Sequence, residues 1–136
     1  MGSDEPTLNN SAEDLVAAAD RSGSFSDIEM VEVSSEPRTV DIHLETPAGH
    51  EYIVMLREDI GKARVLYEDY VFDDVSAHRV LDFVGLMERG EVDLSFTRFL
   101  GRQLVLRVSL PEGDWVDQRR FANDLSEWEK SVLERP

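Results

Sequence analysis

The chain has 136 residues, with 14 Lys and Arg against 29 Asp and Glu, so its formal net charge is −15. It contains no cysteine, which excludes disulfides, thiolate nucleophiles and cysteine-ligated metal sites. No apolar run approaches the roughly 18 residues of a membrane span, and the acidic, polar start is unlike a signal peptide. We therefore expect a soluble cytoplasmic protein with one domain of ordinary size.

Arginine greatly outnumbers lysine among the cations, with twelve Arg but only two Lys, Lys62 and Lys130. An acidic surface dominated by arginine is favoured in a high-salt cytoplasm, because about 1 M salt shortens the Debye length to about 3 Å and weakens self-repulsion. A GC-rich genome also favours arginine, without any such adaptation. Two other interpretations stay open: the acidity matches a basic partner, or it is an ordinary solubilising surface.

The N-terminal part is predicted to contain a head, a helix and an edge strand. Residues 1–10 are polar and without periodicity, which is typical of a flexible acidic head. Residues 11–22 combine a capping pattern at Ser11 with a narrow apolar stripe, which predicts a helix that docks loosely. Ile28–Val33 alternates apolar and acidic residues, so we expect an edge strand there.

Thr39–Arg57 is predicted to form a β-hairpin with a three-residue loop at Pro47-Ala48-Gly49. Proline presets the first turn position, and glycine supplies the left-handed residue that such a loop needs. This loop length brings three pairs of apolar side chains opposite one another on one face: Val40 and Leu56, Ile42 and Val54, and Leu44 and Tyr52. A four-residue loop would place the two apolar sets on opposite faces. We therefore expect one buried face and one solvated face.

The next segment is predicted to be a strand followed by a helix. Lys62–Phe72 is rich in β-branched and aromatic residues and is expected to form one strand, bulged at Glu68-Asp69. Asp73-Asp74 or Ser76 is then expected to cap a helix that runs to about Arg89. Because that helix is apolar around more than one stripe, it is expected to be covered on both flanks or to contribute to a dimer interface.

The C-terminal part is predicted to hold two strands, within 91–99 and 103–110, and a final helix over 114–133. The apolar side of this helix includes Trp115 and Trp128. Its water-facing side includes Arg119 and Glu129.

These elements predict the α+β fold class. The expected architecture is a mainly antiparallel sheet of about five or six strands covered on one face by helices, in the order α-β-β-β-β-α-β-β-α. Residues 11–136 are expected to form a single domain behind the head. A fold of this kind assigns no activity by itself, so function has to be argued from a site.

Metal-binding side-chain types occur in two places, and the candidate ligands are Asp41, His43, Glu68, Asp69, Asp73 and Asp74. Asp41 and His43 alternate along the outward face of one strand, about 7 Å apart, as on any solvated sheet face. The other four lack the residue order of a calcium loop, and capping of a helix explains Asp73-Asp74. No glycine-rich phosphate loop is present either, so we expect neither a metal nor a cofactor.

Three functional hypotheses from different classes remain. The favoured one is a small non-enzymatic binding or regulatory protein that acts through contacts with another, unidentified protein, for which a basic partner is one of the open interpretations of the acidity. Its predicted anchors are Phe83, Leu86, Trp115 and Trp128. The second is a homo-oligomeric structural protein, and the third is a carboxylate- or metal-dependent hydrolase. Direct contact with nucleic acid or a membrane is not expected, because the nearest basic cluster is only Arg119-Arg120.

Overall fold

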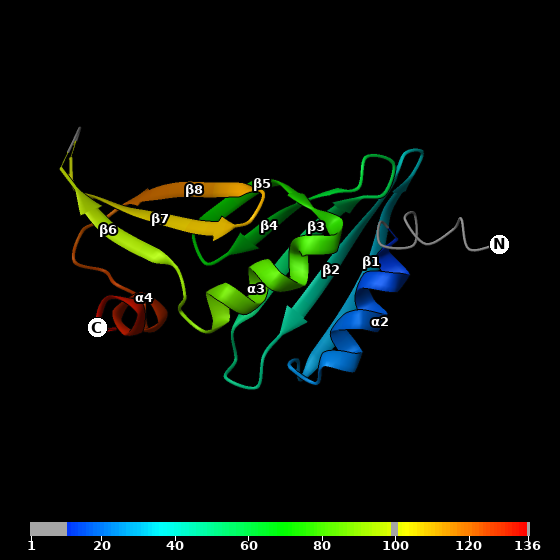
Figure 1. Ribbon diagram of the computed structural model, residues 1–136, viewed down its shortest axis with the longest axis horizontal. Helices are drawn as coiled ribbons and strands as arrows, with labels where there is room; N and C mark the ends of the chain where they lie inside the picture. The colour runs from blue at the N-terminus through cyan, green and yellow to red at the C-terminus, as the bar shows by residue number, and fades with distance from the viewer. Residues whose placement is uncertain (1–10, 99–100, 136) are drawn as a thin grey trace. The chain divides into compact units, whose positions relative to one another are not determined.

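The computed structural model describes residues 11–98 and 101–135 (Figure 1). The chain divides into two compact units, one up to Leu81 and one from Asp82 onward. The predicted α+β class is confirmed, and the strand pairing is antiparallel. Where the sequence predicted one sheet of five or six strands, the described residues form eight strands in a five-stranded and a three-stranded sheet.

The first unit contains helix α2 (Ala12–Ser22), the five-stranded sheet and a short 3-10 helix. The strands neighbour one another in chain order: β1 (Asp27–Ser35), β2 (Arg38–Glu45), β3 (Glu51–Arg57), β4 (Lys62–Tyr67) and β5 (Tyr70–Ser76). The 3-10 helix η2 (Ala77–Arg79) leads into α3 (Val80–Glu88), which continues into the second unit.

The β2–β3 hairpin has the predicted register. Leu44 lies opposite Tyr52, and the other two predicted pairs, Val40 with Leu56 and Ile42 with Val54, are also in place. All six side chains are at most 1% exposed. Burial of an apolar side chain of this size contributes about 1.5–3 kcal/mol, so this face is the centre of the first unit's core. The loop closes through a bond from the Gly49 amide to the Thr46 carbonyl at 2.8 Å, and Gly49 has a φ of 90°.

The segment predicted as a single bulged strand is a second hairpin, so that prediction was wrong. β4 and β5 are joined by a turn at Glu68-Asp69, and Tyr67 lies opposite Tyr70. The turn carries no glycine or asparagine, the usual signals, and Glu68 instead takes a φ of 53°. Since Tyr67, Tyr70 and Phe72 are all buried, the hairpin extends the apolar face that β2 and β3 begin.

Asp73-Asp74 do not cap a helix, contrary to the prediction. Both lie in β5, where the register against β4 shifts and Asp74 takes a φ of 61°. Ser76 does precede η2, but its side chain makes no capping hydrogen bond. The physical reason is that both residues belong to strand β5, which continues alongside β4 to Ser76. Asp73 forms an ion pair there with Arg64 of β4.

Helix α2 begins and ends as its sequence predicts and contacts β1 and β2. The Ser11 hydroxyl accepts a bond from the Asp14 amide at 3.0 Å, and Gly23 ends the helix with a φ of 69°. Ala12, Leu15 and Ala19 are buried. The helix is therefore packed against β1 and β2 by its narrow apolar stripe.

The second unit contains the rest of α3, the three-stranded sheet and helix α4 (Glu127–Leu133). Its strands neighbour one another in the order β6 (Asp93–Thr97), β7 (Gln103–Leu110) and β8 (Gly113–Arg120). The predicted helix over 114–133 was therefore wrong in its first half, which is strand β8. Residues there alternate between half-buried, such as Trp115, and exposed, such as Val116, which is the period of a strand.

Glu129 was predicted to face water and is instead fully buried. Arg119 holds it with two bonds, from Nε to Oε2 at 2.8 Å and from Nη2 to Oε1 at 2.6 Å. Glu129 also accepts a bond from the Ser126 amide and completes a capping box at the start of α4. The side chain is buried because it fastens α4 to β8, which the single predicted helix could not reveal.

Candidate functional site

The five-stranded sheet has one buried face and one open face. The open face is the side opposite Val40 and Leu56. Cross-strand register arranges its side chains in rows, one of which runs through Glu29, His43, Ile53, Leu66 and Val71. The next row runs through Val31, Asp41, Met55 and Arg64. Met55 and Val71 are each 39% exposed, so apolar side chains contribute to the surface of this face.

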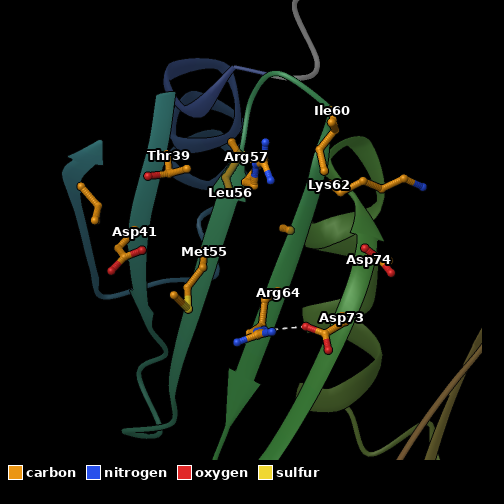
Figure 2. A pocket seen from close by; sticks show the side chains of 12 residues that line it. Thr39, Asp41, Met55, Leu56, Arg57, Ile60, Lys62, Arg64, Asp73 and Asp74 are labelled. Atoms are coloured by element: carbon orange, nitrogen blue, oxygen red, sulfur yellow. Dashed lines mark hydrogen bonds and ion pairs between the residues drawn. The ribbon is translucent and has the colours of Figure 1, made fainter. Parts of the chain in front are cut away.

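A hollow of about 360 Å³ lies on the open face (Figure 2). Apolar residues from three strands and a loop line it, among them Val33, Met55, Ile60 and Ala63. Six charged residues share the lining: the cations Arg57, Lys62 and Arg64, and the carboxylates Asp41, Asp73 and Asp74. The charges balance formally, in a chain whose net charge is −15.

The cations in the hollow differ in how they are neutralised. Arg57 binds Asp59 at 2.6 Å, and this bond holds the pKa of Asp59 below its ordinary value. Arg64 pairs with Asp73, which it faces in Figure 2. Lys62 is half-buried, and its ammonium lies 3.5 Å from the Ser76 hydroxyl. It also lies directly opposite Arg57, an arrangement of like charges that disfavours the sheet unless an anion is near.

A second, smaller hollow of about 160 Å³ lies at the other end of the open face. Its lining is acidic and includes Asp27, Glu29, Glu45 and Glu51, together with His43. Asp27, Glu45 and Glu51 form one cross-strand row, the acidic row. At the opposite end, Thr39, Arg57 and Lys62 form the basic row. The open face is therefore charged oppositely at its two ends.

Strand β1 is an edge of the sheet and is exposed along almost its whole length. In the part of the chain that the structure describes, it pairs only with β2. Met30, Val31 and Val33 are 39%, 57% and 61% exposed. The strand carries Asp27, Glu29 and Glu32 and no Lys or Arg. The sequence predicted an edge strand at Ile28–Val33, and this position is confirmed.

Arg38 anchors the start of β2 to its surroundings. Its guanidinium binds Glu32 on β1, Glu13 on α2 and Glu58 after β3, with distances of 2.8, 2.8 and 2.9 Å. Its hydrogen bond to Glu13 lowers the pKa of that carboxyl. Glu58 also accepts the Ala12 amide at 2.7 Å. This cluster fixes β1 and α2 relative to β2 and so positions the exposed edge.

The six candidate metal ligands are not assembled into a site. Among residues 11–98 and 101–135, no group of three or more His, Asp or Glu side chains is placed to hold a metal ion. Asp41 and His43 lie in different rows of the open face. Glu68 and Asp69 form the β4–β5 turn, whereas Asp73 and Asp74 lie further along β5.

The four predicted anchors are all in the second unit. Phe83 is fully buried and lies edge-on to Trp115, with ring centres 5.9 Å apart. Trp128 is 4% exposed and donates its indole N–H to the Met87 carbonyl at 2.8 Å. Leu86 and Trp115 are half-buried. Alternation of Val31 and Val33 with acids was the signal that could have pointed to β1 instead.

Comparisons of the chain with protein families, with curated proteins and with solved structures found no match. No helix among the described residues is long and apolar enough to cross a membrane. The fold defines a mixed α+β protein, a class that assigns no activity by itself.

Proposed function

We propose that the protein is a non-enzymatic binding or regulatory protein that takes up an extended, basic segment of a partner protein along the free edge of β1. The observation that supports this proposal is the exposed nine-residue edge strand with three exposed apolar side chains. Strand addition to such an edge uses main-chain hydrogen bonds for affinity and alternate side chains for specificity.

The edge lacks most of the devices that block strand addition. Edge strands are usually kept short or carry lysine or proline, and β1 is long and has neither. Its one irregularity is a register shift between Glu32 and Ser34. Pairing with a partner strand is therefore expected along Asp27–Glu32, which precedes the shift.

Charge favours a basic partner over an acidic one. Asp27 and Glu29 stand exposed on the strand, Glu45 and Glu51 continue the acidic surface across the sheet, and no cation lies on β1. Complementary charge accelerates association and disfavours wrong partners. A strand with alternating apolar and cationic residues would place its cations beside Asp27 and Glu29 on the open face. Its apolar side chains would then lie beside Ile28 and Met30 on the other face.

The test uses two synthetic twelve-residue peptides, one alternating Val and Lys and one alternating Val and Glu, with binding followed by fluorescence anisotropy. We expect only the lysine peptide to bind, more weakly as salt rises, and to shift the NMR amide signals of β1. Glu29→Lys should weaken binding at least several-fold. Glu134→Lys, an equal change in net charge at an exposed site in the second unit, should leave affinity nearly unchanged.

Two results would overturn the proposal. One is failure of the lysine peptide to bind at low salt. The other is equal weakening by Glu29→Lys and Glu134→Lys, which would show attraction to the overall charge without use of β1.

A further inference from the structure

The open face carries opposite charges at its two ends, along the direction of its strands. The acidic row (Asp27, Glu45, Glu51) stands at one end and the basic row (Thr39, Arg57, Lys62) at the other. The two rows between them contain the apolar residues Ile53 and Met55 on β3. Neighbouring rows are two residues apart, about 7 Å, so the end rows are separated by about 20 Å.

We propose that this face binds a second copy of the chain, with the two five-stranded sheets packed face to face. Sheets that pack in this way keep their strands roughly aligned and lie about 10 Å apart. The occupant is inferred from charge complementarity, because the face carries both signs at a spacing that it can match with itself. An acidic or basic partner would match only one end.

Only one of the two possible two-fold arrangements matches the charges. A two-fold axis parallel to the strands places acidic row on acidic row and basic row on basic row. An axis that crosses the strands reverses their direction in the second copy, so each acidic row meets a basic row. The second arrangement is the one proposed, since like charges across an interface are strongly disfavoured.

The register then specifies which residues meet. Glu51 and Arg57 occupy the two end rows on β3, so Glu51 of one copy lies against Arg57 of the other. Ile53 and Met55 occupy the two middle rows of the same strand and meet in the centre. On β2, the same operation brings His43 against Asp41. Along β3, this arrangement gives an apolar centre flanked by ion pairs, which is the usual anatomy of a protein interface.

The expected association is weak and is strengthened by salt. Five strands at about 4.8 Å and rows spanning about 20 Å give a footprint of about 500 Å² per copy, below the roughly 800 Å² of a standard interface. Each copy also carries a net charge of −15, whose long-range repulsion is screened as salt rises. Binding of a basic peptide to β1 is expected to weaken as salt rises, so the two proposals predict opposite salt effects.

Sedimentation velocity of the full chain between 10 µM and 1 mM, in low and high salt, tests the proposal. Met55→Lys and Met30→Lys form a matched pair, because both methionines are 39% exposed but lie on different faces of the sheet. Met55 is on the open face, whereas Met30 is the cross-strand partner of Ile42 and shares the other face with it. We expect Met55→Lys to abolish self-association and Met30→Lys to leave it intact. For the peptide at β1, Met30→Lys should weaken binding and Met55→Lys should not.

A charge exchange supplies an independent check. Glu51→Arg and Arg57→Glu should each weaken self-association at least tenfold, because each creates two like-charge contacts across the two-fold axis. The double variant should restore it, because both contacts then have opposite charges again. Circular dichroism confirms that each variant is folded.

A chain that stays monomeric at 1 mM in high salt would overturn this inference. So would self-association that is lost in Met30→Lys but kept in Met55→Lys, which would identify the β1 edge as the contact. Failure of the double variant to recover association would reject the proposed two-fold arrangement. A monomeric chain, or a double variant that does not recover association, leaves the prediction of peptide binding at β1 unchanged, so the two proposals fail separately.

Discussion

The two units differ in how deeply their arginine–carboxylate ion pairs are buried. In the first, Arg38 is 29% exposed and binds three carboxylates at the surface, of which Glu13 is 56% and Glu32 49% exposed. In the second, Arg119 is 10% exposed and its partner Glu129 is fully buried. Surface pairs are screened by salt and contribute little each, whereas a buried pair is costly to break. The same types of ion pair should therefore respond very differently to substitution.

The largest effect is expected at Glu129. Glu129→Ala leaves the Arg119 guanidinium without its buried partner and removes half of the capping box of α4. Breaking a buried pair in this way costs about 3–5 kcal/mol. We expect the lower end, because Asp124 still accepts from Arg119. Urea denaturation measures the loss, and Glu127→Ala, on the same helix but exposed, is the control. Equal effects of the two substitutions would contradict the comparison.

An intermediate effect is expected at the two serine caps. Ser126→Ala removes the hydroxyl that accepts from the Glu129 amide at 3.1 Å, and such caps contribute about 1 kcal/mol. Ser11→Ala removes the equivalent bond to Asp14 in α2, where no reciprocal carboxylate completes a box. Ser126→Ala should therefore reduce the free energy of unfolding more than Ser11→Ala. A larger loss from Ser11→Ala would contradict this ranking.

The smallest effect is expected at Arg38, and it should depend on salt and pH. Arg38→Gln removes the bonds to Glu13, Glu32 and Glu58, and its destabilisation should shrink between 0.1 and 1 M salt as the Debye length falls from about 10 to about 3 Å. The effect of Glu129→Ala should change little over that range. If the destabilisation by Arg38→Gln did not depend on salt, the Arg38 cluster would behave like the buried Arg119–Glu129 pair, and the comparison would be wrong.

The pH dependence of the same cluster has a defined sign. The bond from Arg38 lowers the pKa of Glu13 from its ordinary 4.5. A carboxyl with a lowered folded-state pKa stabilises the fold above its ordinary value and loses that contribution as pH falls through the folded-state value. The difference in the free energy of unfolding between wild type and Arg38→Gln should therefore become smaller as the pH falls below about 4.5.

The sequence predicted elements whose signals were local. The β2–β3 hairpin was predicted to the residue, because Pro47-Ala48-Gly49 sets the loop length and strict alternation sets the face. The β4–β5 hairpin was missed because its turn, Glu68-Asp69, lacks the glycine or asparagine that marks a two-residue turn. The β7–β8 hairpin was missed because the residues after Pro111-Glu112-Gly113 were assigned to a helix and not to strand β8.

Features that depend on distant pairings could not be predicted in this way. Arg119 and Glu129 are ten residues apart and were assigned to one helix, so their contact between strand and helix was invisible. The edge position of β1 was predicted from its alternating pattern. The opposite charges at the two ends of the open face were not predicted, because they appear only when the registers of β1 to β4 align the residues of the acidic and basic rows.

The distribution of aromatic residues gives each unit its own optical reporter. Both tryptophans, Trp115 and Trp128, lie in the second unit, and all three tyrosines, Tyr52, Tyr67 and Tyr70, lie in the first. Indole fluorescence therefore follows melting of the three-stranded part, while near-ultraviolet tyrosine dichroism follows the five-stranded part. Coincident midpoints from the two signals would mean that the chain unfolds as one cooperative whole. Unlabelled protein is sufficient for this measurement.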